Sequence, residues 1–85
     1  MKNQPLTTSE ACAILISDGF IVESFYTRYK KPYYQVNNKY GRVGRITQKQ
    51  FYEMNEADLI VCFENRTDKY GNIHNFFKLY KGEEE

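Results

Sequence analysis

The chain has 85 residues, a formal net charge of +1, 41% hydrophobic residues and 16% aromatic residues. This length fits one small domain, and the hydrophobic share is too high for a disordered chain. No apolar run is long enough to span a membrane and no signal-peptide stretch is present, so we expect a cytoplasmic protein without a membrane partner.

The first predicted element is a helix over about residues 8–17. Thr7 and Glu10 have the spacing of a capping box, in which each side chain accepts a hydrogen bond from the backbone N–H of the other residue. Gly19 follows the helix, and glycine adopts the left-handed backbone conformation at little steric cost. We therefore expect Gly19 to end the helix.

A predicted β-hairpin follows. Residues 20–29 are rich in β-branched and aromatic residues, which indicates a strand. Lys30, Lys31 and Pro32 form the expected turn, and residues 33–36 return as the second strand. Both faces of the first strand carry polar and apolar residues, so the sequence does not indicate which face is buried.

The second half of the chain begins with a turn at residues 37–41. Residues 42–45 are either a short strand or an extended connector. A second capping box at Thr47 and Gln50 predicts a helix over about residues 48–56. The last two strands are expected at residues 59–63 and 73–80.

The order of these elements predicts an α+β fold, with a four-stranded antiparallel sheet and both helices on one face. Helix, strand and strand occur twice, so we interpret residues 6–36 and residues 46–80 as tandem αββ units. The folded domain then covers residues 6–81, between a flexible arm at residues 1–5 and a disordered acidic tail at residues 82–85.

Charge is distributed unevenly along the chain. No acidic residue occurs from Ser24 to Tyr52, whereas all eleven acidic residues lie outside this segment. The segment carries seven basic residues: Arg28, Lys30, Lys31, Lys39, Arg42, Arg45 and Lys49. Folding could convert this asymmetry along the chain into a polarised surface.

Tyrosines alternate with the basic residues of this segment, which favours a small nucleic-acid-binding module with an accessory or regulatory role. Cations neutralise phosphates, and phenol rings offer stacking surfaces or polar contacts. The candidate binding residues are Arg28, Tyr29, Lys30, Lys31, Tyr33, Lys39, Tyr40, Arg42 and Arg45. We expect DNA rather than RNA, with duplex DNA slightly favoured over single strands, and a homodimer would double the number of contacts.

The alternative is a small protein-binding inhibitor or adaptor, of the kind that phages and mobile elements encode. Tyr and Arg are enriched at interface hot spots, so a Tyr/Arg-rich sheet face would also suit a partner protein. Residues 9–36 resemble, in pattern, the recognition helix and wing of a winged-helix domain, which would need two more helices ahead of them.

No enzymatic activity and no cofactor or metal is expected. His74 is the only histidine and has no Ser or Cys at a suggestive spacing, so we interpret it as a structural residue at or near the surface. Cys12 and Cys62 are too few for a disulfide framework and are interpreted as reduced core thiols.

Overall fold

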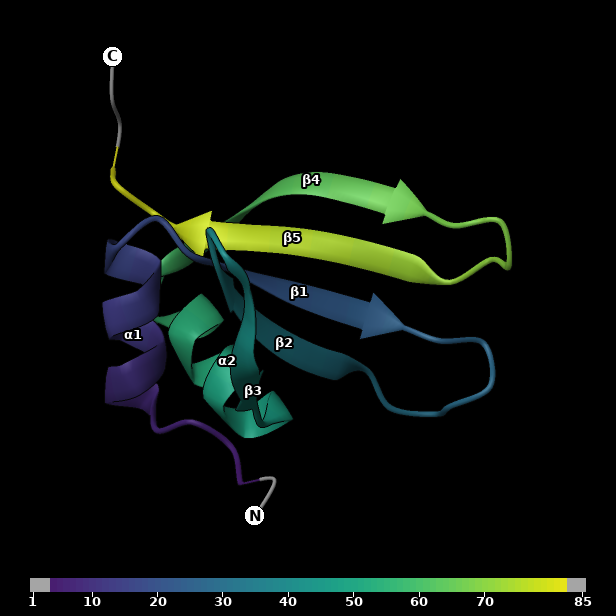
Figure 1. Ribbon diagram of the computed structural model, residues 1–85, viewed down its shortest axis with the longest axis horizontal. Helices are drawn as coiled ribbons and strands as arrows, with labels where there is room; N and C mark the ends of the chain where they lie inside the picture. The colour runs from purple at the N-terminus through teal and green to yellow at the C-terminus, as the bar shows by residue number, and fades with distance from the viewer. Residues whose placement is uncertain (1–3, 83–85) are drawn as a thin grey trace.

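Two helices lie against one face of a five-stranded antiparallel sheet in the computed structural model, which describes residues 4–82 (Figure 1). Most of the expected arm, residues 1–3, and of the acidic tail, residues 83–85, lies outside the described residues. The elements are α1 (Thr8–Ile16), β1 (Phe20–Phe25), β2 (Tyr33–Asn38), β3 (Gly41–Ile46), α2 (Gln48–Glu56), β4 (Ile60–Thr67) and β5 (Ile73–Leu79). The order of the strands across the sheet is β3-β2-β1-β5-β4.

The predicted α+β class is confirmed, but the prediction of four strands is wrong. Residues 41–46 form β3, an edge strand that pairs with β2. The chain reverses tightly before β3 because the side-chain oxygen of Asn38 accepts a hydrogen bond from the backbone N–H of Tyr40 at 2.7 Å. Gly41 then adopts φ +129°, a conformation that favours glycine. What the sequence left open as a connector is therefore the second arm of a hairpin.

Both capping boxes are present. The backbone N–H of Thr7 donates to Glu10 Oε1 at 2.8 Å, and the N–H of Glu10 donates to Thr7 Oγ1 at 3.1 Å. Thr47 and Gln50 make the same pair of bonds at the start of α2. The beginnings of both helices are therefore fixed by four consecutive residues, as predicted.

The predicted role of Gly19 is wrong. Asp18 adopts the left-handed conformation after α1, with φ 71°, and Asp58 does so after α2, with φ 58°. Gly19 is needed for space instead: a Cβ atom there would lie 2.5 Å from Ile14 Cγ2 and 2.6 Å from the backbone oxygen of Asn37. Its lack of a side chain lets the end of α1 approach the sheet.

Strand ends differ from the predictions where local turns intervene. The first strand ends at Phe25 rather than residue 29, because the N–H of Tyr29 bonds the backbone oxygen of Tyr26 and turns the chain. β4 is longer than predicted and reaches Thr67, with a bulge at Phe63. Bulges bend a strand and redirect a side chain without ending the pairing.

The core lies between the helices and one face of the sheet. Ile21 of the central strand β1 pairs with Val36 on one side and Phe77 on the other, and all three belong to this face. The buried core residues are Ala11, Leu15, Ile21, Tyr34, Val36, Ile46, Phe51, Met54 and Ile60. The prediction that both cysteines are core residues is wrong for Cys62, which is exposed, whereas Cys12 packs against the core.

The tandem-repeat prediction is not confirmed in the sheet. β1, the first strand of the first predicted unit, lies inside the sheet beside β5, which is the second strand of the other unit. β1 lies inside the sheet, whereas its counterpart β4 lies at an edge, so these two equivalent strands differ in their surroundings. The five-stranded sheet also excludes the winged-helix alternative. No helix among residues 4–82 is long and apolar enough to cross a membrane.

Candidate functional site

The face of the sheet opposite the helices carries an unusual set of side chains, and we call it the open face. Ser24 of β1 pairs with Tyr33 of β2 and with His74 of β5, and cross-strand partners share a face. The same alternation places two arginines of β3 and one of β4 on it. The open face comprises Phe20, Val22, Ser24, Tyr33, Gln35, Asn37, Arg42, Arg45, Val61, Phe63, Glu64, Arg66, His74, Phe76 and Lys78.

Three phenylalanines form an aromatic cluster on the open face. The ring centroids of Phe20, Phe63 and Phe76 are 6.1 to 6.4 Å apart. Arg66 lies over the ring of Phe76 at 5.0 Å, and Lys78 lies over the ring of Phe63 at 5.5 Å. Phe63 is 44% exposed even though it is one of the largest apolar side chains of the sheet. Proteins that bind unpaired nucleotides use cations for the phosphates and accessible aromatic rings for the bases, and this cluster has both.

Three of the predicted binding residues extend the open face toward the β3 edge. Arg42 lies over the ring of Tyr33 at 5.6 Å and donates a hydrogen bond to its hydroxyl oxygen. Arg45 pairs with Gln35 and lies on the same face. The structure therefore brings Tyr33, Arg42 and Arg45 together, as the sequence suggested.

The other predicted residues lie at the two ends of the sheet. Arg28, Tyr29, Lys30 and Lys31 belong to the loop between β1 and β2, which projects beyond the helices beside the β4–β5 loop (Figure 1). Lys39 and Tyr40 form the β2–β3 turn at the opposite end. The expectation that all these residues meet on one shared surface is thus wrong for Lys39 and Tyr40, because the full length of β2 separates them from the β1–β2 loop.

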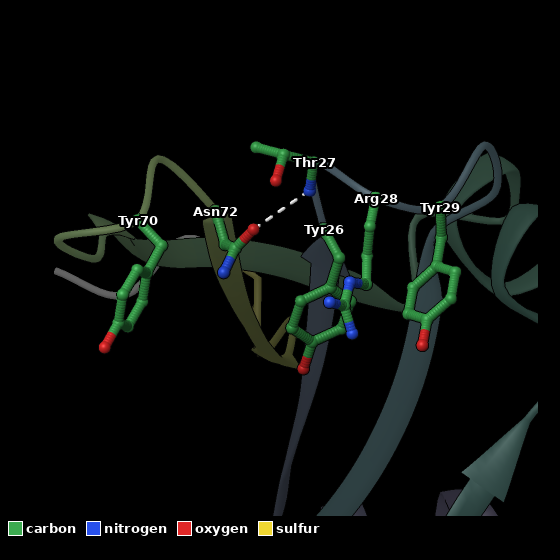
Figure 2. Close-up of a pocket in the computed structure, with 6 residues that line it drawn as sticks. All are labelled: Tyr26, Thr27, Arg28, Tyr29, Tyr70 and Asn72. Atoms are coloured by element: carbon green, nitrogen blue, oxygen red, sulfur yellow. Dashed lines mark hydrogen bonds between the residues drawn. The ribbon is translucent and has the colours of Figure 1, made fainter.

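The loop residues line a cavity of about 460 Å³, which we call the loop-end pocket (Figure 2). Its lining residues are Tyr26, Thr27, Arg28, Tyr29, Tyr70 and Asn72. The pocket adjoins the open face, since the ring of Tyr26 makes an edge contact with that of His74, with ring centroids 5.8 Å apart. Two predicted residues, Arg28 and Tyr29, therefore meet residues from a loop more than forty positions later in the chain.

Acidic and basic residues lie on different elements of the fold. The helices and their flanking residues expose five acidic residues and one basic residue: Glu10, Asp18, Glu53, Glu56, Asp58 and Lys49. The described strands and their loops carry ten basic residues and only three acidic ones, Glu23, Glu64 and Asp68. Glu23 is buried on the helix-covered face, and Glu64 pairs with Arg66 at 2.5 Å. The strands and their loops are consequently basic and the helices acidic.

Ser24, His74 and Asp68 form a hydrogen-bonded line that the sequence did not suggest. Ser24 Oγ lies 2.8 Å from His74 Nδ1, and His74 Nε2 lies 3.3 Å from Asp68 Oδ2. The same residue types serve as catalytic triads, but a nucleophile must be reached by its substrate, and Ser24 is only 4% exposed in the central strand. We interpret the line as a brace between β1 and the β4–β5 loop, in keeping with a structural, half-buried histidine.

Asp68 is the centre of the β4–β5 loop. Desolvation alone would raise its pKa, but hydrogen bonds from the side chain and backbone of Asn72, from His74 and from the backbone of Tyr70 outweigh it and lower the pKa to about 2. The carboxylate therefore stays charged and holds the loop in shape. Among residues 4–82, no group of three His, Cys, Asp or Glu side chains could hold a metal ion.

The sequence missed the residues of the second half of the chain: Phe63, Arg66, Tyr70, Phe76 and Lys78. His74, Phe76 and Lys78 recur at every second position, which indicates a shared strand face, but joining them to Arg66 requires the register of β4 with β5. Comparisons of the chain with protein-family models, with curated proteins and with solved structures find no match. The geometry of the open face therefore carries the functional argument.

Proposed function

We propose that this protein is a cytoplasmic nucleic-acid-binding module whose open face holds a single strand. The observation that carries the proposal is the aromatic cluster with its two cations, Arg66 and Lys78, on the basic side of a charge-segregated domain. Arg42, Arg45 and Tyr33 extend the same surface. Rings stack on unpaired bases, while the cations neutralise phosphates.

The geometry favours a single strand over the duplex expected from sequence. In a duplex the bases are stacked on one another and only their edges face the grooves, so the rings of Phe63 and Phe76 would have no stacking partner. An extended single strand exposes its base faces and can lie across a sheet. DNA and RNA both have flat base rings and phosphates, so either could bind in this way. DNA remains the first expectation. The proposed module acts by binding alone and uses no cofactor.

Fluorescence anisotropy with labelled 12-nucleotide DNA, RNA and duplex DNA, at 50 and 200 mM salt, tests the proposal. We expect micromolar binding of the single strands that weakens steeply with salt. Arg66→Ala should weaken binding and reduce the salt slope by about 0.7 for a lost phosphate contact. Lys49→Ala is the matched control, because Lys49 is an exposed cation of α2 in the helical layer. Equal losses in both variants would contradict the proposal.

A second pair of variants tests the rings. Phe63→Leu keeps an apolar side chain on the sheet but removes the stacking surface, which is worth about 1–3 kcal/mol per base. Tyr52→Leu removes a ring of similar exposure from α2. We expect a loss of affinity of about fivefold or more for Phe63→Leu and none for Tyr52→Leu.

The competing function is a protein interface on the same open face, as an inhibitor or adaptor would use. Absence of binding to all three nucleic acids at 50 mM salt would reject the nucleic-acid proposal. The exposed rings and cations would then favour a partner protein, because both are enriched at interface hot spots.

A further inference from the structure

The loop-end pocket lies where the β1–β2 and β4–β5 loops meet, beyond the part of the sheet that the helices cover (Figure 1). Its volume, about 460 Å³, is in the range of small-molecule sites. Three of its lining residues are tyrosines, one is an arginine, and none is acidic. The pocket is therefore lined by ring surface and one positive charge.

Hydrogen bonds hold the two loops in a fixed arrangement. Asn72 Oδ1 accepts a hydrogen bond from the backbone N–H of Thr27 at 2.9 Å, which joins the β4–β5 loop to the β1–β2 loop (Figure 2). The side-chain amide of Asn72 donates to Asp68 Oδ2 at 3.1 Å, and its backbone N–H donates to Asp68 Oδ1 at 3.0 Å. The floor of the pocket is thus formed before a ligand arrives, which reduces the entropy lost on binding.

The rings and the cation are available to a ligand. Figure 2 shows the side chains of Tyr70, Tyr26, Arg28 and Tyr29 extending in the same direction from the two loops. Tyr29 and Tyr70 are 62% and 72% exposed, and the rings of Tyr26 and Tyr29 meet at 84°, which leaves a corner rather than a closed stack. Within the described part of the chain, Arg28 makes no hydrogen bond or ion pair.

We infer that the loop-end pocket binds one unpaired nucleotide, with its base against the tyrosine rings and its phosphate on Arg28. A nucleotide has a flat base and an anionic phosphate. The base matches the corner formed by the tyrosine rings, and the guanidinium of Arg28 can bind the phosphate through two parallel N–H donors. The inference rests on the proposed function, because the contact between Tyr26 and His74 places the pocket next to the open face. A strand lying on the open face would deliver one of its nucleotides into the pocket.

The first test uses the full chain and 5′-AMP, followed by NMR of the tyrosine ring signals, with adenosine and inorganic phosphate as separate probes. AMP should shift the rings of Tyr26, Tyr29 and Tyr70. Arg28→Ala and Tyr70→Ala should each weaken AMP binding about tenfold, as for one charge-assisted hydrogen bond or one stacked ring. Lys49→Ala, which removes an exposed cation of α2 and does not touch the pocket, should leave AMP binding unchanged.

Two results would overturn the inference: no shift of the three rings at millimolar AMP, or equal losses for Arg28→Ala and Lys49→Ala. Adenosine binding as tightly as AMP would overturn the phosphate contact of Arg28.

Oligonucleotide binding separates this inference from the proposed function. If the 12-nucleotide strand binds with unchanged affinity in Arg28→Ala and Tyr70→Ala, and AMP shifts no pocket ring, the pocket is rejected and the open face stands. If AMP binds in the pocket but no strand binds the protein, the nucleotide site stands and the proposed function is rejected.

Discussion

Replacing Tyr34 by phenylalanine removes one hydroxyl group from the buried side of the sheet. This hydroxyl donates to Glu23 Oε2 at 2.9 Å, and Asn75 donates to Glu23 Oε1 at 3.1 Å. Glu23 is 8% exposed, so a hydrogen bond from water cannot fully replace the one lost from Tyr34. The ring of Tyr34 stacks on Phe51 with centroids 4.4 Å apart, and phenylalanine retains this contact.

The expected cost is therefore that of one buried hydrogen bond to a charged group, about 1.5–3 kcal/mol of unfolding free energy. For a domain of this size, each 1 kcal/mol lowers the Tm by roughly 4–8 °C. Urea unfolding followed by circular dichroism measures the effect. Tyr40→Phe is the control, since Tyr40 is 85% exposed in the β2–β3 turn and should change stability by less than about 0.5 kcal/mol.

The pH dependence offers a second readout. Burial first, and then the hydrogen bond to Glu23 and its charge, raise the pKa of Tyr34 above its ordinary value of 10.0. Because the pKa is raised in the folded state, the contribution of Tyr34 to the unfolding free energy is complete below pH 10 and declines as the pH rises further. Wild type should therefore lose stability more steeply above pH 10 than Tyr34→Phe. Equal stability of Tyr34→Phe and Tyr40→Phe at pH 7 would refute the account of this buried bond.

Three further predictions concern the elements that position the site. Gly19→Ala should lower the unfolding free energy by about 1–3 kcal/mol in urea, because the new methyl group would lie 2.5 Å from Ile14 Cγ2. Thr47→Ala removes the acceptor of the α2 capping box and should cost about 1 kcal/mol in the same assay, whereas Thr47→Ser should not. Asp68, with its pKa lowered to about 2 from 3.8, contributes stability above pH 3.8 that is lost as the pH falls toward 2. The stability difference between wild type and Asp68→Asn should therefore narrow over that interval in acid titrations, and a constant difference would contradict the bonding of this carboxylate.

Features that depend on a few consecutive residues could be predicted from the sequence. The capping boxes at Thr7 and Thr47 are complete within four residues, and α2 begins and ends at the residues that the pattern indicated. The end of α1 was less clear, because glycine commonly takes the left-handed position and here Asp18 does so. Gly19 is required by a contact with Asn37, and the sequence contains no local sign of that contact.

Features that depend on strand pairing could not be predicted. β5 lies between β1 and β4, and this order sets which side chains share the open face. The cationic segment indicated Tyr33, Arg42 and Arg45 correctly as neighbours, since β2 and β3 are joined by a short turn. Arg66 and Phe76 come from the other half of the chain and join the surface only through the register of β4 with β5.

NMR mapping with a 12-nucleotide single strand tests the central claim most directly, because it reports where the strand lies on the domain. Side-chain signals of Phe63 and Phe76 and the guanidinium signal of Arg66 should shift together on titration, while the ring of Tyr52 on α2 remains unchanged. Shifts confined to α1 and α2, or no shifts at low salt, would contradict binding at the open face.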